Sequence, residues 1–182
     1  MPVPLGVKPD HSFNEPLGLL SDCHRRIEQF LDLLIKVNDE ATDDLSATHR
    51  EALQVALRYF SVAAPKHTQD EEASLFPRLR DVNSPEARQA MAKLDALESD
   101  HVRADAAHAE MDVLGLRWLQ DGRLAPEKRQ RMRELLNELR ELYRGHIEIE
   151  DREVFPLAAR VLSPDQVDQV GQEMAERRGL SK

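Results

Sequence analysis

The chain carries the sequence HTQDEEASLFP at residues 67–77 and HIEIEDREVFP at residues 146–156. Both stretches read His, three residues, Glu, four residues and Phe-Pro, and each matched position in the second lies 79 residues after its partner. Agreement at one fixed offset indicates an internal repeat. Residues four apart lie on one face of an α-helix, so each copy places an imidazole beside a carboxylate.

Around these stretches, apolar residues recur at intervals of three and four, which is typical of amphipathic helices packed in a bundle. Capping residues and early prolines predict long helices that begin near Pro16, Ser46, Ser84 and Ala125, and a short one that begins at Ser163. Short connections imply antiparallel neighbours. The predicted fold class is all-α, an antiparallel up-down four-helix bundle with an extra short C-terminal helix.

The chain has 182 residues, which suits one domain with a full core. We expect an irregular N-terminal leader over residues 1–13, the bundle over residues 14–162, and a C-terminal helix and tail over residues 163–182. The leader has no apolar segment of the kind found in a secretory signal.

Composition and charge argue against nucleic-acid binding and against a membrane span. The net charge is −9, with Lys+Arg 25 against Asp+Glu 34, and no basic tract is present, so nucleic acid is not an expected partner. No apolar run reaches about 18 residues, so no membrane span is expected. The one cysteine, Cys23, cannot form an intrachain disulfide, which fits a reducing setting and a cytoplasmic location.

Each of the four predicted bundle helices carries a histidine on its apolar stripe, namely His24, His67, His101 and His146, and the third helix also carries His108. In an antiparallel pair, two residues lie at the same height when the turn falls halfway between them. The midpoints between successive histidines fall at 45–46, 84 and 123–124, all within predicted connections. One level of the bundle is therefore expected to gather these side chains and the two repeated carboxylates, namely His24, His67, Glu71, His101, His146 and Glu150. Pro65 should kink the second helix two residues before its histidine.

A lone histidine on an apolar stripe is usually an ordinary core residue, but four at one level favour a metal site. Burying four imidazoles and two carboxylates without partners would be costly, and a metal removes that cost. This ligand set suits iron, manganese or zinc, and six ligands exceed the four of a structural zinc. Two metals fit, each with two imidazoles and both carboxylates bridging. With an oxo or hydroxo bridge, an exchangeable position remains for a small diatomic ligand or peroxide.

Ferritin-like di-iron bundles are the nearest alternative. They need a Glu-x-x-His pair on each of two helices, and this chain has one such pair, Glu98 and His101. Glu98 is better interpreted as a flanking group, a partner of a ligand or a solvated side chain.

These motifs resemble the hemerythrin-like family, also called the HHE cation-binding domain, over about residues 14 to 160. The resemblance rests on His24, the two His-x3-Glu motifs with their Phe-Pro, and His101. It implies a non-haem centre of two iron ions in an up-down bundle. Oxygen-carrying members have five histidines, two of them four apart on one helix, whereas His101 and His108 here lie seven apart. The chain is therefore similar to bacterial members with four histidines and two glutamates, which are linked to sensing of oxygen, nitric oxide or iron, to iron-sulfur repair and to peroxide handling.

Four further residues carry open interpretations. His108 is predicted to be a core histidine or a partner of a ligand rather than a ligand. Tyr143 lies one turn before His146 and either donates a hydrogen bond near the metals or only packs. Cys23 is expected to be an inert, half-buried thiol, and Trp118 to close one end of the bundle.

Three functions are consistent with these residues. The preferred one is a protein that binds or senses dioxygen, nitric oxide or peroxide at a di-iron centre; a sensor would act through a homodimer or a separate signalling partner. The second is a di-iron oxidoreductase or an iron-sulfur repair protein acting on peroxide or nitric oxide. The third is a bundle in which the metal only stabilises the fold.

Overall fold

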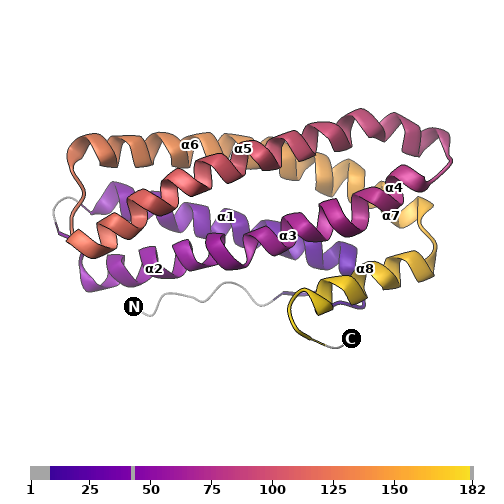
Figure 1. The fold of residues 1–182 in the computed structure, drawn as a ribbon, viewed down its shortest axis with the longest axis horizontal. Coiled ribbons are helices and arrows are strands. Elements are labelled where there is room, and N and C mark those ends of the chain that lie inside the picture. Colours follow the sequence, from indigo (N-terminus) through magenta and orange to yellow (C-terminus); the bar gives the residue numbers. More distant parts are fainter. Residues whose placement is uncertain (1–8, 42–43, 181–182) are drawn as a thin grey trace.

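The computed structural model describes residues 9–41 and 44–180. Parts of the expected leader, of the first interhelical turn and of the C-terminal tail lie outside these residues. The described residues form an all-α fold, which confirms the predicted class (Figure 1). The elements, in chain order, are α1 (Pro16–Glu40), α2 (Ala47–Val62), α3 (Ala64–Asp70), η1 (Glu71–Leu75), α4 (Phe76–Asp81), α5 (Pro85–Asp121), α6 (Pro126–Ile149), η2 (Glu150–Val154), α7 (Phe155–Val161) and α8 (Pro164–Glu176).

The bundle consists of four antiparallel rods, each made of one helix or of consecutive helical segments (Figure 1). The first rod is α1, the second runs from α2 through α3 and η1 to α4, the third is α5, and the fourth runs from α6 through η2 to α7. Two of the four rods begin with the predicted side-chain caps, whereas α1 and α6 begin at Pro16 and Pro126 without one. Ser46 and Ser84 accept hydrogen bonds from the backbone N–H groups of His49 and Ala87, and Gly122 ends α5 in the left-handed conformation. The helix that follows the bundle, α8, begins with Ser163 and Gln166 satisfying each other's backbone N–H groups.

Two apolar clusters fill the bundle, one toward each end. The first, here called the α2-end cluster, lies among α1, α2, α5 and α6 and includes Leu53, Leu57, Trp118, Met132 and Leu135. The second, the α8-end cluster, lies on the side where α4, α7 and α8 meet and includes Leu75, Phe76, Leu94, Phe155 and Met174. Trp118 is buried at the end of the bundle, as predicted.

The C-terminal helix α8 and the two arginines that follow it are held against α3 and α4 by ion pairs. Asp70 is fully buried and accepts hydrogen bonds from the guanidinium groups of Arg177 and Arg178, at 2.8 and 2.7 Å. Arg78 pairs with Glu173 at 2.7 Å. The segment that carries the first copy of the repeated motif is therefore linked by ion pairs to α8 and the arginines that follow it.

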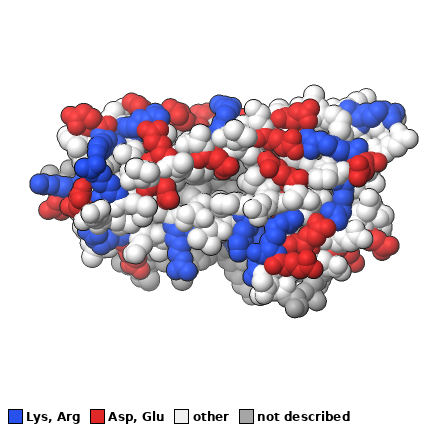
Figure 2. Space-filling view, in the orientation of Figure 1, with Lys and Arg blue, Asp and Glu red and all other residues white. Residues whose placement is uncertain are grey.

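The molecular surface mixes charges of both signs. Acidic and basic side chains alternate across the face seen in Figure 2. Within the described residues, no helix has both the length and the apolar character of a membrane-crossing segment.

Candidate metal centre

The second rod breaks where the sequence predicts a kink. Pro65 cannot donate a backbone hydrogen bond, and α2 ends at Val62 while α3 begins at Ala64. The backbone N–H of His67 donates to the Ala63 carbonyl at 3.4 Å, so the helix resumes before the histidine. His67 therefore lies one turn beyond the break and faces the inside of the bundle.

Both repeated carboxylates open a π-helical segment, a feature that the sequence analysis does not predict. The N–H of Phe76 donates to the Glu71 carbonyl, and the N–H of Phe155 donates to the Glu150 carbonyl, each across five residues. The residue after each phenylalanine is a proline, which has no N–H for the usual bond four residues back. The widened turn thus belongs to the Phe-Pro part of the repeat, and such π segments often occur at functional sites.

The structure brings all six predicted side chains together at one level between the two apolar clusters. Each is buried, and both glutamates are fully inaccessible to solvent. They form two overlapping groups, in each of which the candidate ligand atoms lie within 4.8 Å of one another. The first group is His24, His67, Glu71 and Glu150, and the second is Glu71, His101, His146 and Glu150.

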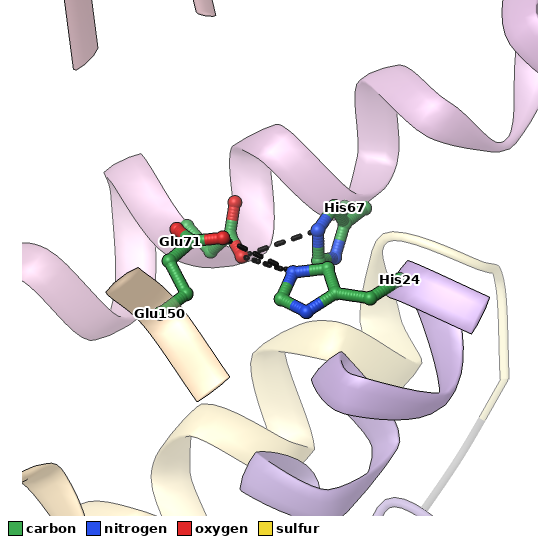
Figure 3. A group of neighbouring side chains, drawn as sticks. All are labelled: His24, His67, Glu71 and Glu150. Atoms are coloured by element: carbon green, nitrogen blue, oxygen red, sulfur yellow. Dashed lines mark ion pairs between the residues drawn. The ribbon is translucent and has the colours of Figure 1, made fainter. Parts of the chain in front are cut away.

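The first group is drawn in Figure 3, where both carboxylates point toward the two imidazoles. His24 Nε2 lies 3.0 Å from Glu150 Oε2 and 3.7 Å from Glu71 Oε1. His67 Nε2 lies 3.2 Å from Glu71 Oε1. The spacing of His67 and Glu71 is the one-turn arrangement that the sequence predicts.

The second group reuses the same two glutamates. His101 Nε2 lies 3.4 Å from Glu71 Oε2, and His146 Nε2 lies 3.1 Å from Glu150 Oε2. Glu71 therefore presents one oxygen to each group. The Nε2 atoms of His101 and His146 lie 3.1 Å apart.

The cluster leaves buried polar atoms unsatisfied. All four carboxylate oxygens of Glu71 and Glu150, and Nε2 of His24, have no hydrogen-bond partner among the described residues. Buried carboxylates without donors are costly. Imidazole nitrogens and carboxylate oxygens are the ligands that iron, manganese and zinc take in proteins. The residues therefore fit a site for metal cations.

Without metal, protons balance the buried charge. Burial opposes protonation of His24, but hydrogen bonding with carboxylates, first among them Asp151, raises its pKa well above the ordinary value. Burial likewise opposes protonation of His101, but contact with Glu71 raises its pKa to about 9. Burial lowers the pKa of His67. For Glu71, burial alone would raise the pKa, but the surrounding histidines lower it. Metal binding must displace the imidazole protons.

Three acidic side chains lie at the outer nitrogens of the clustered histidines. Nδ1 of His24 lies 3.0 Å from Asp151, and Nδ1 of His101 lies 2.8 Å from Glu72. These carboxylates accept a hydrogen bond and so direct each Nε2 toward the cluster, as partners of metal-binding histidines commonly do.

The third acid, Asp100, lies 3.7 Å from Nδ1 of His146. Sequence reasoning missed all three acids. The repeat holds a signal for two of them, since Glu72 and Asp151 are themselves 79 residues apart and each follows a clustered glutamate.

A cavity of about 230 Å³ lies against the cluster and is lined by residues of α1, α2, α3, α5 and α6. All four clustered histidines line it. Its walls are mostly apolar, and they include Ile27, Phe60, Ala104, Met111 and Ile147. His108 and Tyr143 also line the cavity, and His108 Nε2 lies 2.7 Å from the Tyr143 hydroxyl. A small molecule can thus reach the imidazoles through an apolar passage.

The other residues whose roles the sequence left undecided lie outside the two groups of candidate ligands. Glu98 pairs with Arg80 at 2.7 Å and lies outside the two metal-binding groups. Cys23 is buried rather than half-buried, and burial raises the pKa of its thiol. His108 is not a member of either group and instead bonds to Tyr143.

Comparison with known proteins agrees with this geometry. Residues 15–161 match the family described as the hemerythrin HHE cation binding domain. An uncharacterized protein of Haemophilus influenzae is 31% identical over 174 residues, which cover 94% of this chain and 94% of the relative. The matched span contains every residue of the two groups.

Proposed function

The chain belongs to the hemerythrin HHE cation-binding family, and on that premise we propose that it holds two iron ions and binds a small oxidant there. The candidate ligands are His24, His67, Glu71, His101, His146 and Glu150. We assign this role to a domain over residues 14–162, and the family match over residues 15–161 supports that span.

The observation that carries the proposal is the sharing of two carboxylates between two groups of four residues. Each group has two imidazoles of its own, and Glu71 presents one oxygen to each. One cation would leave the two imidazoles of the other group without a metal partner. Two cations would give each pair of imidazoles a partner, and manganese or zinc would suit the same donors as iron.

The cavity supports binding of an external ligand. Bound iron would supply an exchangeable position for a small molecule such as dioxygen, nitric oxide or peroxide. The protein's own contribution is to hold the imidazoles through Asp151 and Glu72, to keep bulk water away with apolar walls, and to leave a passage. A metal that only stabilised the fold would not need a cavity that reaches its ligands.

Metal content tests the proposal. We expect about two irons per chain, with an absorption spectrum that changes on addition of oxygen or nitric oxide. His67→Ala should lower the iron content by at least about half, whereas His49→Ala, outside both groups, should leave it unchanged. One zinc per chain, no metal, or full iron content in His67→Ala would contradict the proposal.

Turnover is the second candidate function. The same centre could act as an oxidoreductase on peroxide or nitric oxide, or in iron-sulfur repair, and the polar pair His108 and Tyr143 in the cavity favours keeping this candidate. Steady consumption of peroxide or nitric oxide by the iron-loaded protein, at many equivalents per chain, would distinguish turnover from binding.

A further inference from the structure

We propose that His108 and Tyr143 form a hydrogen-bond-donating pair that binds a small acceptor, of the peroxide or diatomic class, inside the cavity next to the metal cluster. The inference rests on the proposed function and adds to it the residues that recognise the external ligand.

The two side chains reach the same cavity from different helices. His108 lies on α5, two turns after His101, and Tyr143 lies on α6, one turn before His146. Residues at these spacings share a helix face. Both side chains line the cavity together with the four clustered histidines, and the 2.7 Å hydrogen bond between them crosses from one helix to the other.

The surroundings fix the protonation of the pair. Burial lowers the pKa of His108 to about 4, and burial raises the pKa of Tyr143. At neutral pH the imidazole is therefore uncharged and the phenol keeps its proton. The packing of the His108 ring against Phe60, with centroids 4.6 Å apart, is consistent with an uncharged ring.

A count of protons shows that the pair has one donor to spare. A neutral imidazole has one N–H and a phenol has one O–H, and the mutual hydrogen bond uses only one of the two. Nδ1 of His108 is buried and has no hydrogen-bond partner among the described residues. In one tautomer the spare donor is the Nδ1–H of His108, and in the other it is the hydroxyl of Tyr143. A buried donor without an acceptor is unfavourable, and a ligand in the cavity would satisfy it.

The cavity limits what that ligand can be. Its deep walls are apolar, while the acidic side chains of its lining, Asp105 and Asp112, belong to the more accessible part of α5. The lining residues contain no Lys or Arg to bind a carboxylate or phosphate. The volume of about 230 Å³ readily admits a molecule of a few atoms, and the single neutral donor suits one that carries a weakly negative oxygen or nitrogen.

Azide is a suitable probe because it is small, accepts hydrogen bonds and gives an infrared band. The full-length iron-loaded protein is titrated with azide, and the affinity and the shift of the azide stretch between H₂O and D₂O are measured. The double variant His108→Phe/Tyr143→Phe replaces both polar groups with apolar rings, a change that buried pairs often tolerate. The single variant Tyr143→Phe is measured alongside it.

We expect the double variant to bind azide about tenfold more weakly, the loss of one hydrogen bond, and to lose the D₂O shift. The single variant should lie between it and the unmodified protein. The control is Tyr59→Phe, which removes the chain's other tyrosine hydroxyl; that hydroxyl lies 3.4 Å from the Cys23 carbonyl, and Tyr59 does not line the cavity. Its azide affinity should stay within about twofold of the original, and iron content should be equal in all proteins.

Two failures can be told apart. If the unmodified protein forms an azide adduct and the double and single variants keep both its affinity and its D₂O shift, the donor role of the pair is wrong while the proposed function stands. If the unmodified protein takes up no iron or forms no adduct, the proposed function is wrong and this inference falls with it.

Discussion

Asp151 and Glu72 decide how two of the clustered histidines are oriented. Each accepts a hydrogen bond from an Nδ1 atom and so leaves Nε2 for the interior, and Asp151 also accepts one from Ser21 at 2.7 Å. The contacts are reciprocal between the repeats: the acid after Glu150 holds the histidine of the first rod, and the acid after Glu71 holds that of the third. A repeat that supplies candidate metal ligands thus also supplies the groups that orient them.

We predict that Asp151→Asn and Glu72→Gln each weaken metal affinity by about 10- to 100-fold. The amide side chain keeps nearly the same shape but lacks the charge that favours a donating, correctly oriented imidazole. Competition with a coloured chelator measures the affinity. Glu148→Gln is the matched control, since Glu148 is exposed and pairs with Arg152 on the surface. Unchanged affinity in both variants would show that packing alone orients the histidines.

His108 predicts a pH dependence of stability. Burial lowers the pKa of His108 to about 4 in the folded protein, whereas its pKa in the unfolded chain is the ordinary value near 6.5. Between these values the unfolded state binds more protons, so the free energy of unfolding falls as the pH drops from about 6.5 to about 4, by at most about 3 kcal/mol. Above about pH 6.5 this effect is absent.

The check compares urea unfolding of the metal-free protein and of metal-free His108→Gln at pH 7 and pH 4.5. Gln can still bond to the Tyr143 hydroxyl but does not titrate, so the variant should lose less stability than the original over this interval. An equal loss in both proteins would mean that folding does not lower the pKa of His108.

At the scale of whole elements, local chemistry predicted most of the architecture. Serine caps, early prolines and Gly122 mark the helix ends, and the apolar period of three and four residues identified the inward faces. The six clustered residues were predicted because antiparallel rods with short turns place matched positions at one height. These features depend on residues that lie close together along the chain, so the sequence alone predicts them.

The π segments and the docking of α8 were not predicted, for a physical reason. A π turn is a shift of backbone hydrogen bonds by one residue, and the Phe-Pro pair is equally consistent with an ordinary kink or a helix end. Asp70 reads as one more acid in a polar motif, and only the fold shows that it is fully buried against Arg177 and Arg178. Contacts made across more than a hundred residues leave no local pattern.

We predict that Asp70→Asn lowers the free energy of unfolding by about 2 kcal/mol and loosens α8. Removing one member of a buried ion pair costs about 3–5 kcal/mol, and partial exposure of the two arginines reduces this. Urea unfolding measures the stability, and trypsin cleavage after Arg177 and Arg178 should become faster in the folded protein. The control Glu176→Gln changes an exposed acid on the same helix, and equal cleavage in all three proteins would contradict a docking role for Asp70.

For the molecule as a whole, the polar cluster separates two apolar cores. The α2-end cluster draws mainly on α1, α2, α5 and α6, while the α8-end cluster combines residues of α1 and α5 with the short elements α4, α7 and α8. Two of the four rods that join the two ends pass through η1 and η2, which begin at the candidate ligands Glu71 and Glu150, while α1 and α5 run through without a break. The candidate ligands therefore lie where the two interrupted rods change from their longer helices to the short helices α4 and α7.

Metal removal should consequently affect the two ends unequally. A bound ion stabilises the folded state by about 2.7 kcal/mol when its concentration is 100 times its dissociation constant, and without it buried carboxylates keep only the histidines as partners. We expect chelation to increase amide hydrogen exchange most in η1, η2, α4 and α7, because local opening there exposes the cluster to water. Amides around Leu53 and Leu135, both buried in the α2-end cluster, should keep most of their protection. Hydrogen exchange followed by mass spectrometry, before and after chelation, makes the comparison within one protein. A uniform loss of protection along all four rods would mean that the bundle unfolds as a single unit and that the cluster does not divide it.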